Sequence, residues 1–258
     1  MSASFTLWHK HMTKLRGNSE EFIGLMIQPV IWLVIFGAGM KGMMGTGGGD
    51  DSLYIAFMMP GIVAFTTLSG GVAGGTTWLD ERLRGIVKEY LAAPIPRLSI
   101  LMGNATGIVT KVLVQSVLIL LVGLLMGASL SDNPLGWLGG FLLIAGYGIG
   151  FSGLALAVAS STDSSGGYHM MIFMLQLPLL FLSNSLYPLE TLPTWMRIGA
   201  YANPTTYVVT GLRKITLGAT PTMGAVANIP LWLCFAVAAG FAVFGMYIAL
   251  KAFEKAIK

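Results

Sequence analysis

One stretch decides how this chain folds: residues 177–213 read LPLLFLSNSLYPLETLPTWMRIGAYANPTTYVVTGLR. The stretch leaves an apolar segment at Gln176, turns at a series of prolines, and reaches Arg213 through Asn-Pro-Thr-Thr-Tyr at 203–207. Proline interrupts helices, while tryptophan and tyrosine are enriched where membranes meet water. The stretch therefore predicts a chain that leaves one membrane span and forms a short helical hairpin at the membrane surface before it enters another span.

The hairpin is expected between Leu192 and Arg213, with breaks at Pro193 and Pro204. Pro204 should lie in the first turn of the second helix, where a missing N–H does least harm. Arg213 and Lys214 would then lie near the end of that helix, where cations can meet its last carbonyls and lipid headgroups. The residues expected to form this outer gate are Leu192, Pro193, Trp195, Asn203, Pro204, Tyr207 and Arg213.

The composition places the rest of the chain in a membrane as well. Of its 258 residues, 55% are hydrophobic and only 10% are charged, and the mean hydropathy is +0.75. These values lie outside the range of soluble globular domains. The 34 glycines agree, because small residues let spanning helices approach one another closely. The single cysteine, Cys234, excludes an intrachain disulfide.

Six segments approach the roughly 20 residues that a helix needs to cross a bilayer. We predict spans at 22–40, 53–78, 99–126, 135–159, 168–183 and 229–250. The fifth is short and contains Pro178, so we expect it to be kinked or broken near its outer end. The predicted fold is an all-α integral membrane protein with six transmembrane helices in a single domain over residues 1–258.

Lysine and arginine set the expected orientation. With six spans both termini share one side, and that side would hold ten of the fifteen basic residues, against four on the other side. Because cytoplasmic loops are rich in lysine and arginine, both termini are expected in the cytoplasm, with the protein in the plasma membrane. The net charge of +4 then needs no nucleic-acid partner, since anionic lipid and the insertion rule account for it.

The first 20 residues lack the apolar core of a signal peptide, so we expect the first span to be retained. They form instead the pattern of an amphipathic helix that lies in the membrane interface, with apolar residues three and four apart and cations on other faces. The apolar positions are Phe5, Trp8, Met12 and Leu15, and the cations are Lys10, Lys14 and Arg16.

The densest charge cluster lies at 80–97, between the second and third predicted spans. Apolar residues at helical spacing run through it, and Pro94 and Pro96 should end the helix. An amphipathic helix held between two spans at the cytoplasmic face is suited to docking on a soluble partner. The predicted docking residues are Glu81, Arg82, Leu83, Arg84, Ile86, Val87, Lys88, Glu89 and Tyr90.

With these segments in place, the chain resembles the permeases of ABC-2 type transporters. The resemblance is carried by Leu192-Pro193, by Pro204-Thr205-Thr206-Tyr207 and by Arg213 at the family's spacing. The charge-rich segment ending in Leu-Ala-Ala-Pro at 91–94 resembles the coupling helix of that family, and residues 190–218 resemble its outer re-entrant hairpin. The daunorubicin-resistance and Nod-factor export permeases are the most similar group.

The resemblance implies an exporter of hydrophobic or amphipathic substrates that works by alternating access between two permease copies. Two ATPase subunits would dock on the coupling segments. This chain contains no G-x-x-x-x-G-K-[ST] motif for nucleotide phosphates. We therefore expect no cofactor and no enzymatic activity in this chain, with ATP and Mg²⁺ bound by a separate ATPase polypeptide.

Lys111 is the only basic residue inside a predicted span, and two interpretations of it stay open. It either marks the cytoplasmic edge of the span and snorkels, or lines a substrate path together with Gln115. The predicted spans contain no aspartate or glutamate. Because proton- and sodium-coupled carriers use such groups, this weakens the main alternative, a single-chain secondary transporter.

A rhomboid-like intramembrane serine protease is a remote alternative, because residues 150–153 in the fourth span read Gly-Phe-Ser-Gly. A nucleophilic serine needs a base within about 3 Å. The sixth predicted span contains no histidine, and His169 opens the fifth span near the cytoplasmic surface, roughly 12 Å from Ser152 along the helix axis at 1.5 Å per residue. Ser152 is better explained as part of a small-residue packing face.

Overall fold

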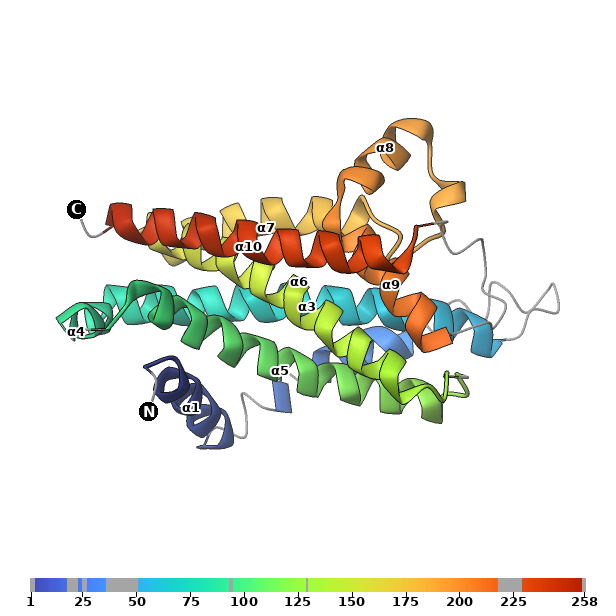
Figure 1. The fold of residues 1–258 in the computed structure, drawn as a ribbon, viewed down its shortest axis with the longest axis horizontal. Coiled ribbons are helices and arrows are strands. Elements are labelled where there is room, and N and C mark those ends of the chain that lie inside the picture. Colours follow the sequence, from blue (N-terminus) through green and yellow to red (C-terminus); the bar gives the residue numbers. More distant parts are fainter. Residues whose placement is uncertain are drawn as a thin grey trace.

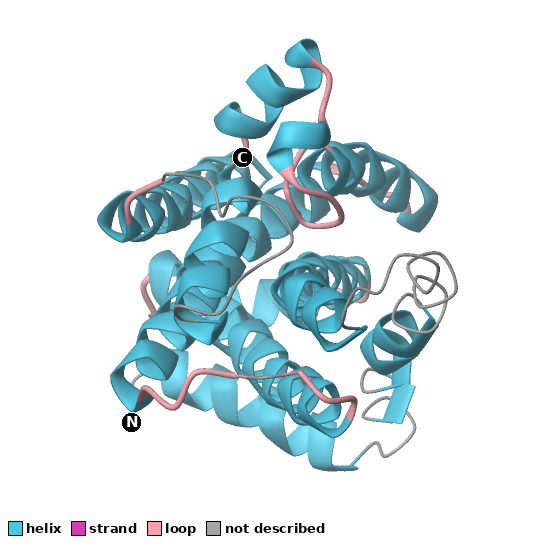
Figure 2. Cartoon of the chain, turned by 90° about the vertical axis from the view of Figure 1, so that its right-hand side faces the viewer, coloured by secondary structure: helices cyan, strands magenta, loops and turns pink. Residues whose placement is uncertain are grey.

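The computed structural model describes residues 3–17, 23–24, 27–35, 51–92, 95–128, 130–217 and 229–256. Within these ranges all regular elements are helices (Figure 1 and Figure 2). Four of them are long and apolar enough to cross a membrane. They are α3 (Asp51–Leu83), α5 (Arg97–Leu125), α6 (Pro134–Ser161) and α10 (Leu231–Ala256).

These four helices match the predicted spans two, three, four and six. The predicted fifth span corresponds to α7 (Ser165–Phe181), which has 17 residues and contains Pro178. The predicted first span is described only at 23–24 and 27–35, where it is helical, and the rest of 22–40 lies outside the described residues. In the described ranges the all-α architecture with apolar helices of membrane-spanning length is therefore confirmed, and the count of six spans stays a prediction.

The centre of the bundle is formed by α3 and α6. Within their most apolar stretches 78% and 61% of the residues are buried, against 39% in α5 and 28% in α10. The outer helices expose apolar side chains such as Leu121 on α5 and Phe244 on α10. Such side chains are as apolar as lipid tails, so these faces are suited to contact with the bilayer.

Glycines bring α6 and α10 together. A Cβ atom added to Gly245 would overlap the backbone carbonyl of Gly150, so neither helix leaves room for a side chain there. Nearby, Tyr147 of α6 stacks on Phe241 of α10 with ring centroids 5.5 Å apart. Ser152 is fully buried in this contact region and its hydroxyl donates to the Ile149 carbonyl oxygen at 3.0 Å. The glycine-serine run therefore packs helices, and its hydroxyl is not presented to a base.

The remaining helices lie at opposite ends of the bundle (Figure 1). At the left end of the view are α1 (Ala3–Gly17), α4 (Ile86–Ala92) and the C-terminal end of α10. At the other end are α8 (Thr194–Ala202) and α9 (Pro204–Leu217). We call these the α4 end and the α8 end. The two ends of the chain and the charged segment thus share one side, opposite the hairpin.

The N-terminal helix α1 packs across α5. Leu7 and His11 are buried and lie directly over Gly103 and Gly107, where an added Cβ atom would come within 2.7 and 2.9 Å of them. Trp8 Nε1 donates to Thr110 Oγ1 at 3.0 Å. The expected amphipathic helix is therefore present over residues 3–17, and one of its faces is covered by the protein itself.

Candidate functional site

The predicted docking segment is two helices rather than one. α3 continues beyond Trp78 to Leu83, the chain turns at Arg84 and Gly85, and α4 begins at Ile86. Gly85 has a φ of +82°, a conformation that glycine adopts readily and that commonly ends a helix. The expectation that Leu83, Ile86, Val87 and Tyr90 lie on one helix was therefore wrong. We refer to residues 80–92 as the α3–α4 segment.

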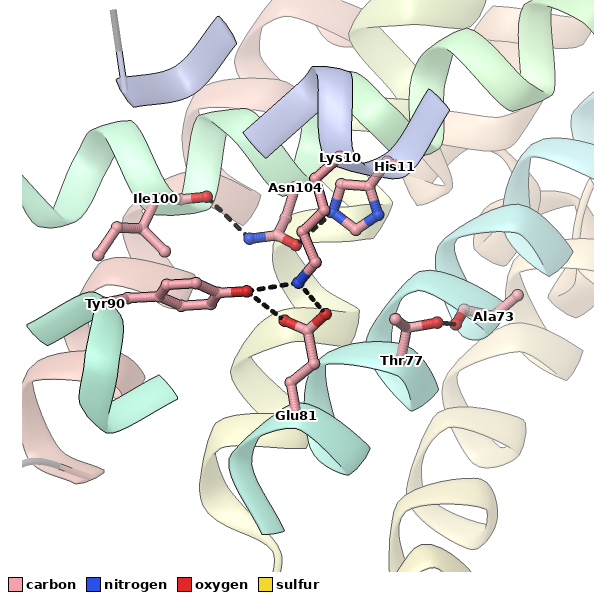
Figure 3. Close-up of polar contacts among 8 residues, drawn as sticks. All are labelled: Lys10, His11, Ala73, Thr77, Glu81, Tyr90, Ile100 and Asn104. Atoms are coloured by element: carbon pink, nitrogen blue, oxygen red, sulfur yellow. Dashed lines mark hydrogen bonds and ion pairs between the residues drawn. The ribbon is translucent and has the colours of Figure 1, made fainter. Parts of the chain in front are cut away.

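The inner side of the α3–α4 segment is tied to α1 (Figure 3). Lys10 Nζ donates to Glu81 Oε1 at 2.5 Å and also to the Tyr90 hydroxyl oxygen, and that hydroxyl donates to Glu81 Oε2 at 3.1 Å. Three helices, α1, α3 and α4, thus meet in one polar cluster. The Glu81 side chain is only 12% exposed, so its carboxylate is committed to this cluster rather than to an external partner.

A second inward contact comes from Arg82. Its guanidinium donates to the carbonyl oxygens of Ala159 and Thr162 at 3.2 and 2.7 Å and to Asp163 Oδ1 at 2.9 Å. These groups belong to the end of α6 and the connection to α7. Arg82 therefore joins the end of α3 to the end of α6, and Val87 is buried as well.

The outer side of the segment is formed by the other predicted residues. Leu83 is 53% exposed, Arg84, Lys88 and Glu89 are exposed, and Ile86 is half-buried. The predicted apolar stripe is therefore divided, because Leu83 points outward and Val87 inward. The surface open to a partner combines one apolar side chain with both signs of charge.

Burial and hydrogen bonding set the protonation of the polar cluster. Burial opposes the charge of Lys10, but its hydrogen bonds with Glu81 and Tyr90 outweigh this and raise its pKa. Burial raises the pKa of Tyr90. Lys10 is therefore a cation and Tyr90 a neutral hydroxyl at neutral pH, which is the arrangement that the three hydrogen bonds require.

Next to this cluster, His11 forms the contact between α1 and α5 (Figure 3). Its Nε2 lies 2.8 Å from Asn104 Oδ1, while Asn104 Nδ2 donates to the Ile100 carbonyl oxygen at 2.9 Å. Since Oδ1 can only accept, Nε2 carries the proton and donates. Burial lowers the pKa of His11 below its usual value.

A groove of about 740 Å³ lies between residues 27–35, α3 and α7. Aromatic side chains, including Trp32, Phe65 and Phe173, form much of its wall. A second, apolar cavity of about 290 Å³ shares Trp32 and Phe65 with it and extends to Leu186 and Gly61. The polar groups of the groove are spread along it, and they are Gln28, Ser69, Thr76, His169 and Gln176. This lining suits a molecule that is largely apolar and carries some hydrogen-bonding groups.

Lys111 and Gln115 do not line the groove. Both border a cavity of about 30 Å³ between α1, α3 and α5, with His11 and Asn104. A cavity of this size holds one or two water molecules. Gln115 also borders a cavity of about 80 Å³ that shares Ser69 and Ala73 with the groove. Lys111 and Gln115 thus lie on the other side of α3 from the groove. A role for them in a pathway stays a prediction.

The two short helices predicted after Leu192 are present as α8 and α9, and Pro204 begins the second of them. Asn203 joins them to the rest of the bundle. Its Oδ1 accepts the Thr205 N–H at 2.9 Å, and its Nδ2 donates to the carbonyl oxygens of Leu179 and Leu182 at 2.9 and 2.5 Å. The side-chain amide of Asn203 therefore forms hydrogen bonds with backbone groups both at the start of α9 and at the end of α7.

Only α8 lies on the surface. Trp195 and Ile198 are each 69% exposed, as aromatic and apolar anchors at a membrane interface would be. In contrast, most of α9 is buried against α3, α6 and α10. Tyr207 is half-buried and its hydroxyl donates to the Tyr201 carbonyl oxygen at 2.8 Å. Of the predicted hairpin, α8 therefore lies at the surface while α9 belongs to the core, and the role of the hairpin as an outer gate stays a prediction.

The expectation that Arg213 meets lipid headgroups was wrong. Its exposed fraction is 3%, and its guanidinium donates to the carbonyl oxygens of Phe57 and Asn184 at 3.1 and 2.6 Å. Lys214 does lie near the end of α9 and donates to the Ile229 carbonyl oxygen at 2.6 Å. Arg213 turns inward because α9 packs against α3 along that face.

Sequence reasoning missed the polar groups of the groove. A signal was present, because Ser69, Val72, Ala73 and Thr76 all line the groove and recur at helical spacing in an otherwise apolar span. Gln176 carries a similar signal in α7, where its Nε2 donates to Ser69 Oγ at 3.4 Å. Amides and hydroxyls inside membrane spans tend to face protein or a pathway rather than lipid.

The resemblance to the ABC-2 permeases rested on two features. They are an interrupted helix pair at one end of the spans and a charged turn at the other. Comparison with known proteins decides whether the chain belongs to that family. The family description of the ABC-2 type transporter matches residues 3–217, which include both features. The chain belongs to the ABC-2 type transporter family. Members of this family are membrane permeases that work with ABC ATPase subunits.

Individual relatives of this ABC-2 permease carry related names. A protein of Cyanophora paradoxa named as the transport permease ycf38 is 30% identical over 213 residues, which is 81% of this chain and 72% of the relative. The daunorubicin resistance ABC transporter permease protein DrrB1 of Streptomyces coeruleorubidus is 27% identical, and the match covers 84% of this chain and 76% of the relative. Nodulation protein J of Rhizobium leguminosarum bv. trifolii is 27% identical, and the match covers 77% of this chain and 74% of the relative. The first two of these relatives are named as transport permeases.

Proposed function

We propose that this chain is the membrane permease subunit of an ATP-driven exporter that moves a hydrophobic or amphipathic substrate out of the cytoplasm or the inner leaflet. The energy would come from a separate ABC ATPase, which binds ATP and Mg²⁺. In this proposal the α3–α4 segment receives the motion of the ATPase, and the groove beside α3 holds the cargo.

The observation that carries this proposal is the continuity of α3. This helix has 33 residues, so it is about 50 Å long at 1.5 Å per residue. Its last residue is the exposed Leu83, which adjoins the charged turn at Arg84, and its middle supplies Phe65, Ser69 and Thr76 to the groove wall. Its one proline, Pro60, lies before the groove residues, so a displacement of the end at Leu83 would reach the groove wall along an uninterrupted stretch of helix.

The outer surface of the α3–α4 segment is suited to an ATPase partner. Leu83 offers an exposed apolar anchor, and Arg84, Lys88 and Glu89 surround it with charges. An apolar anchor in a polar rim is the usual composition of a protein interface. The internal bonds of Glu81 and Arg82 hold this surface rigidly to α1 and α6, as transmission of force requires.

Two permease copies and two ATPase subunits would complete the transporter. The groove is open to the surface along residues 27–35 and α7, where Ile31, Met170 and Met174 are exposed. A second copy facing this side would enclose a shared cavity that alternates between inward and outward access. A homodimer is the simplest such assembly, and a related permease could take the second position.

We further propose that the α4 end faces the cytoplasm and that the protein lies in the plasma membrane. Lys10, Lys14, Arg84 and Lys88 lie at this end of the bundle, and Lys255 near the end of α10 joins them. Cytoplasmic loops are enriched in such residues. The α8 end, with Trp195 exposed, would then face the outside.

Affinity for the ATPase tests the docking proposal. Leu83→Asp should weaken binding of the ATPase to the purified permease at least tenfold, because loss of a central anchor costs about 1.4 kcal/mol or more. Leu98→Asp is the matched control, since Leu98 is 48% exposed at the same end of the bundle but belongs to α5. Equal affinities of both variants and the parent chain would refute docking at the α3–α4 segment.

A further inference from the structure

The bundle contains a buried cation, Arg213, whose polar partners are main-chain carbonyls. Its guanidinium donates to the Phe57 carbonyl oxygen on α3 and to those of Asn184 and Ser185, at 3.1, 2.6 and 3.4 Å. It also lies 3.7 Å from the centre of the Phe57 ring, in a cation–π contact. Neither of the ion pairs found in the described residues involves Arg213. One side chain thus joins three segments of the chain.

The segment held in this way is the turn of residues 182–187, where the chain has left α7 and has not yet reached the hairpin. Its backbone carbonyls have no helical partners, and a buried carbonyl without a donor is costly. The guanidinium supplies the donors for two of them. The turn is held from a second side by Asn184 Nδ2, which donates to Thr210 Oγ1 of α9 at 2.8 Å.

The same turn forms part of the wall of the apolar cavity that adjoins the groove. The Ser185 carbonyl lies so close to Gly61 of α3 that an added Cβ atom there would overlap it. The next residue, Leu186, lines the cavity together with Gly61 and Ile62. The position of residues 184 and 185 therefore determines how far Leu186 reaches toward α3.

We infer that Arg213 is a positioning residue that fixes the 182–187 turn against α3 and thereby sets the shape of the apolar cavity that adjoins the groove. Its importance for cargo rests on the proposed function of the groove. The three carbonyls lie on two separate segments, and a planar guanidinium with five donors can reach them at once. A lysine ammonium is a point charge on a flexible stem and would serve fewer of them, so Arg213→Lys should restore the turn only in part.

Cysteine labelling of the permease alone, in proteoliposomes without ATPase or cargo, tests the inference. Leu186→Cys in a Cys234→Ala background reports the turn. Arg213→Met should raise its rate of maleimide labelling about tenfold, as expected for a locally opened segment, and Arg213→Lys should raise it less. The matched control is Lys214→Met, because this neighbouring cation bonds the Ile229 carbonyl oxygen instead and should leave the rate unchanged.

A second reporter separates local positioning from general loss of structure. Trp195→Cys on α8 should label at the same rate in all variants, because Trp195 is exposed and not held by Arg213. If Arg213→Met does not fold, Thr210→Val loosens the same turn by removing the acceptor of Asn184 Nδ2 and should also raise labelling at 186.

Unchanged labelling at 186 in Arg213→Lys and Thr210→Val, or equal increases at 186 and 195, would overturn the inference. Because the labelling experiment does not measure transport, failure of the export proposal would not change its outcome.

Discussion

The ammonium nitrogen of Lys10 lies 2.5 Å from Glu81 Oε1 and joins residues that are 71 positions apart in the sequence. The contact fastens α1 to the last turn of α3, next to the turn that is proposed to meet the ATPase. Since α1 also lies across α5 through His11 and Asn104, a displacement of the α3–α4 segment has a direct route to a second span.

Lys10→Met should therefore disturb coupling more than stability. The Lys10 side chain is 41% exposed, so its loss should reduce the free energy of unfolding by no more than about 1 kcal/mol. In proteoliposomes with the ATPase, the ratio of substrate transported to ATP hydrolysed should fall several-fold. Lys14→Met, a change of an exposed lysine on the same helix, is the control. The same ratio in both variants would exclude α1 from transmission.

The stability of the α1–α5 contact should depend on pH through His11. Burial lowers the pKa of this residue, so the folded state favours the neutral ring and the unfolded chain binds a proton more readily. The contribution of neutral His11 to the stability of the fold is complete above the unfolded pKa of about 6.5 and is lost as the pH falls below that value. Glu81 of α3 favours the protonated ring, whereas Lys10 of α1 and Lys111 of α5 oppose it.

Thermal unfolding in detergent between about pH 5 and 8 measures this effect. The parent chain should lose stability on acidification, and His11→Gln should show a flatter profile, because glutamine can donate to Asn104 Oδ1 without titrating. Parallel profiles of the two proteins would assign the acid sensitivity to other groups.

The close approach of α6 and α10 should tolerate no side chain at Gly245. Gly245→Val places methyl groups against the Gly150 carbonyl and should reduce the free energy of unfolding by about 1–3 kcal/mol. Gly240→Val on the same helix meets nothing within 4 Å and controls for the effect of valine on helix propensity. Comparable melting temperatures of the two variants would contradict the packing described for this helix pair.

Filling the groove should block transport without preventing ATPase docking. Ala73 is exposed on the groove wall, so Ala73→Trp would occupy much of the space beside α7. We expect transport to fall at least tenfold while the affinity for the ATPase stays the same. Val243→Trp, on an exposed site of α10 outside the groove, is the control. Full transport by Ala73→Trp would place the cargo path elsewhere.

Four apolar helices of spanning length and the two short helices after Leu192 could be predicted, because both depend on local signals. Long apolar runs require helices in a membrane, and Pro204 starts α9 where a proline fits. The shape of the α3–α4 segment was missed although its signal was also local. A stripe from Leu83 to Tyr90 indicated a continuous helix, but Gly85 interrupts it and turns Leu83 away from Val87.

The role of Arg213 could not be predicted from its neighbours in the sequence. A cation near the end of a hairpin helix is usually explained by carbonyls and headgroups nearby. Its actual partners, Asn184 and Phe57, are 29 and 156 residues away, and packing of α9 against α3 brings them together. The groove likewise depends on how residues 27–35, α3 and α7 are placed in space.

In the proposed transporter, the α3–α4 segment moves the groove wall when the ATPase closes. The most direct measurement is the rate at which Thr76→Cys, in a Cys234→Ala background, reacts with a maleimide in the reconstituted complex, with and without nucleotide trapped by vanadate. We predict that trapping changes this rate several-fold and that adding Leu83→Asp abolishes the change. An identical rate in both nucleotide states, with the ATPase bound and active, would contradict this coupling between the α3–α4 segment and the groove wall.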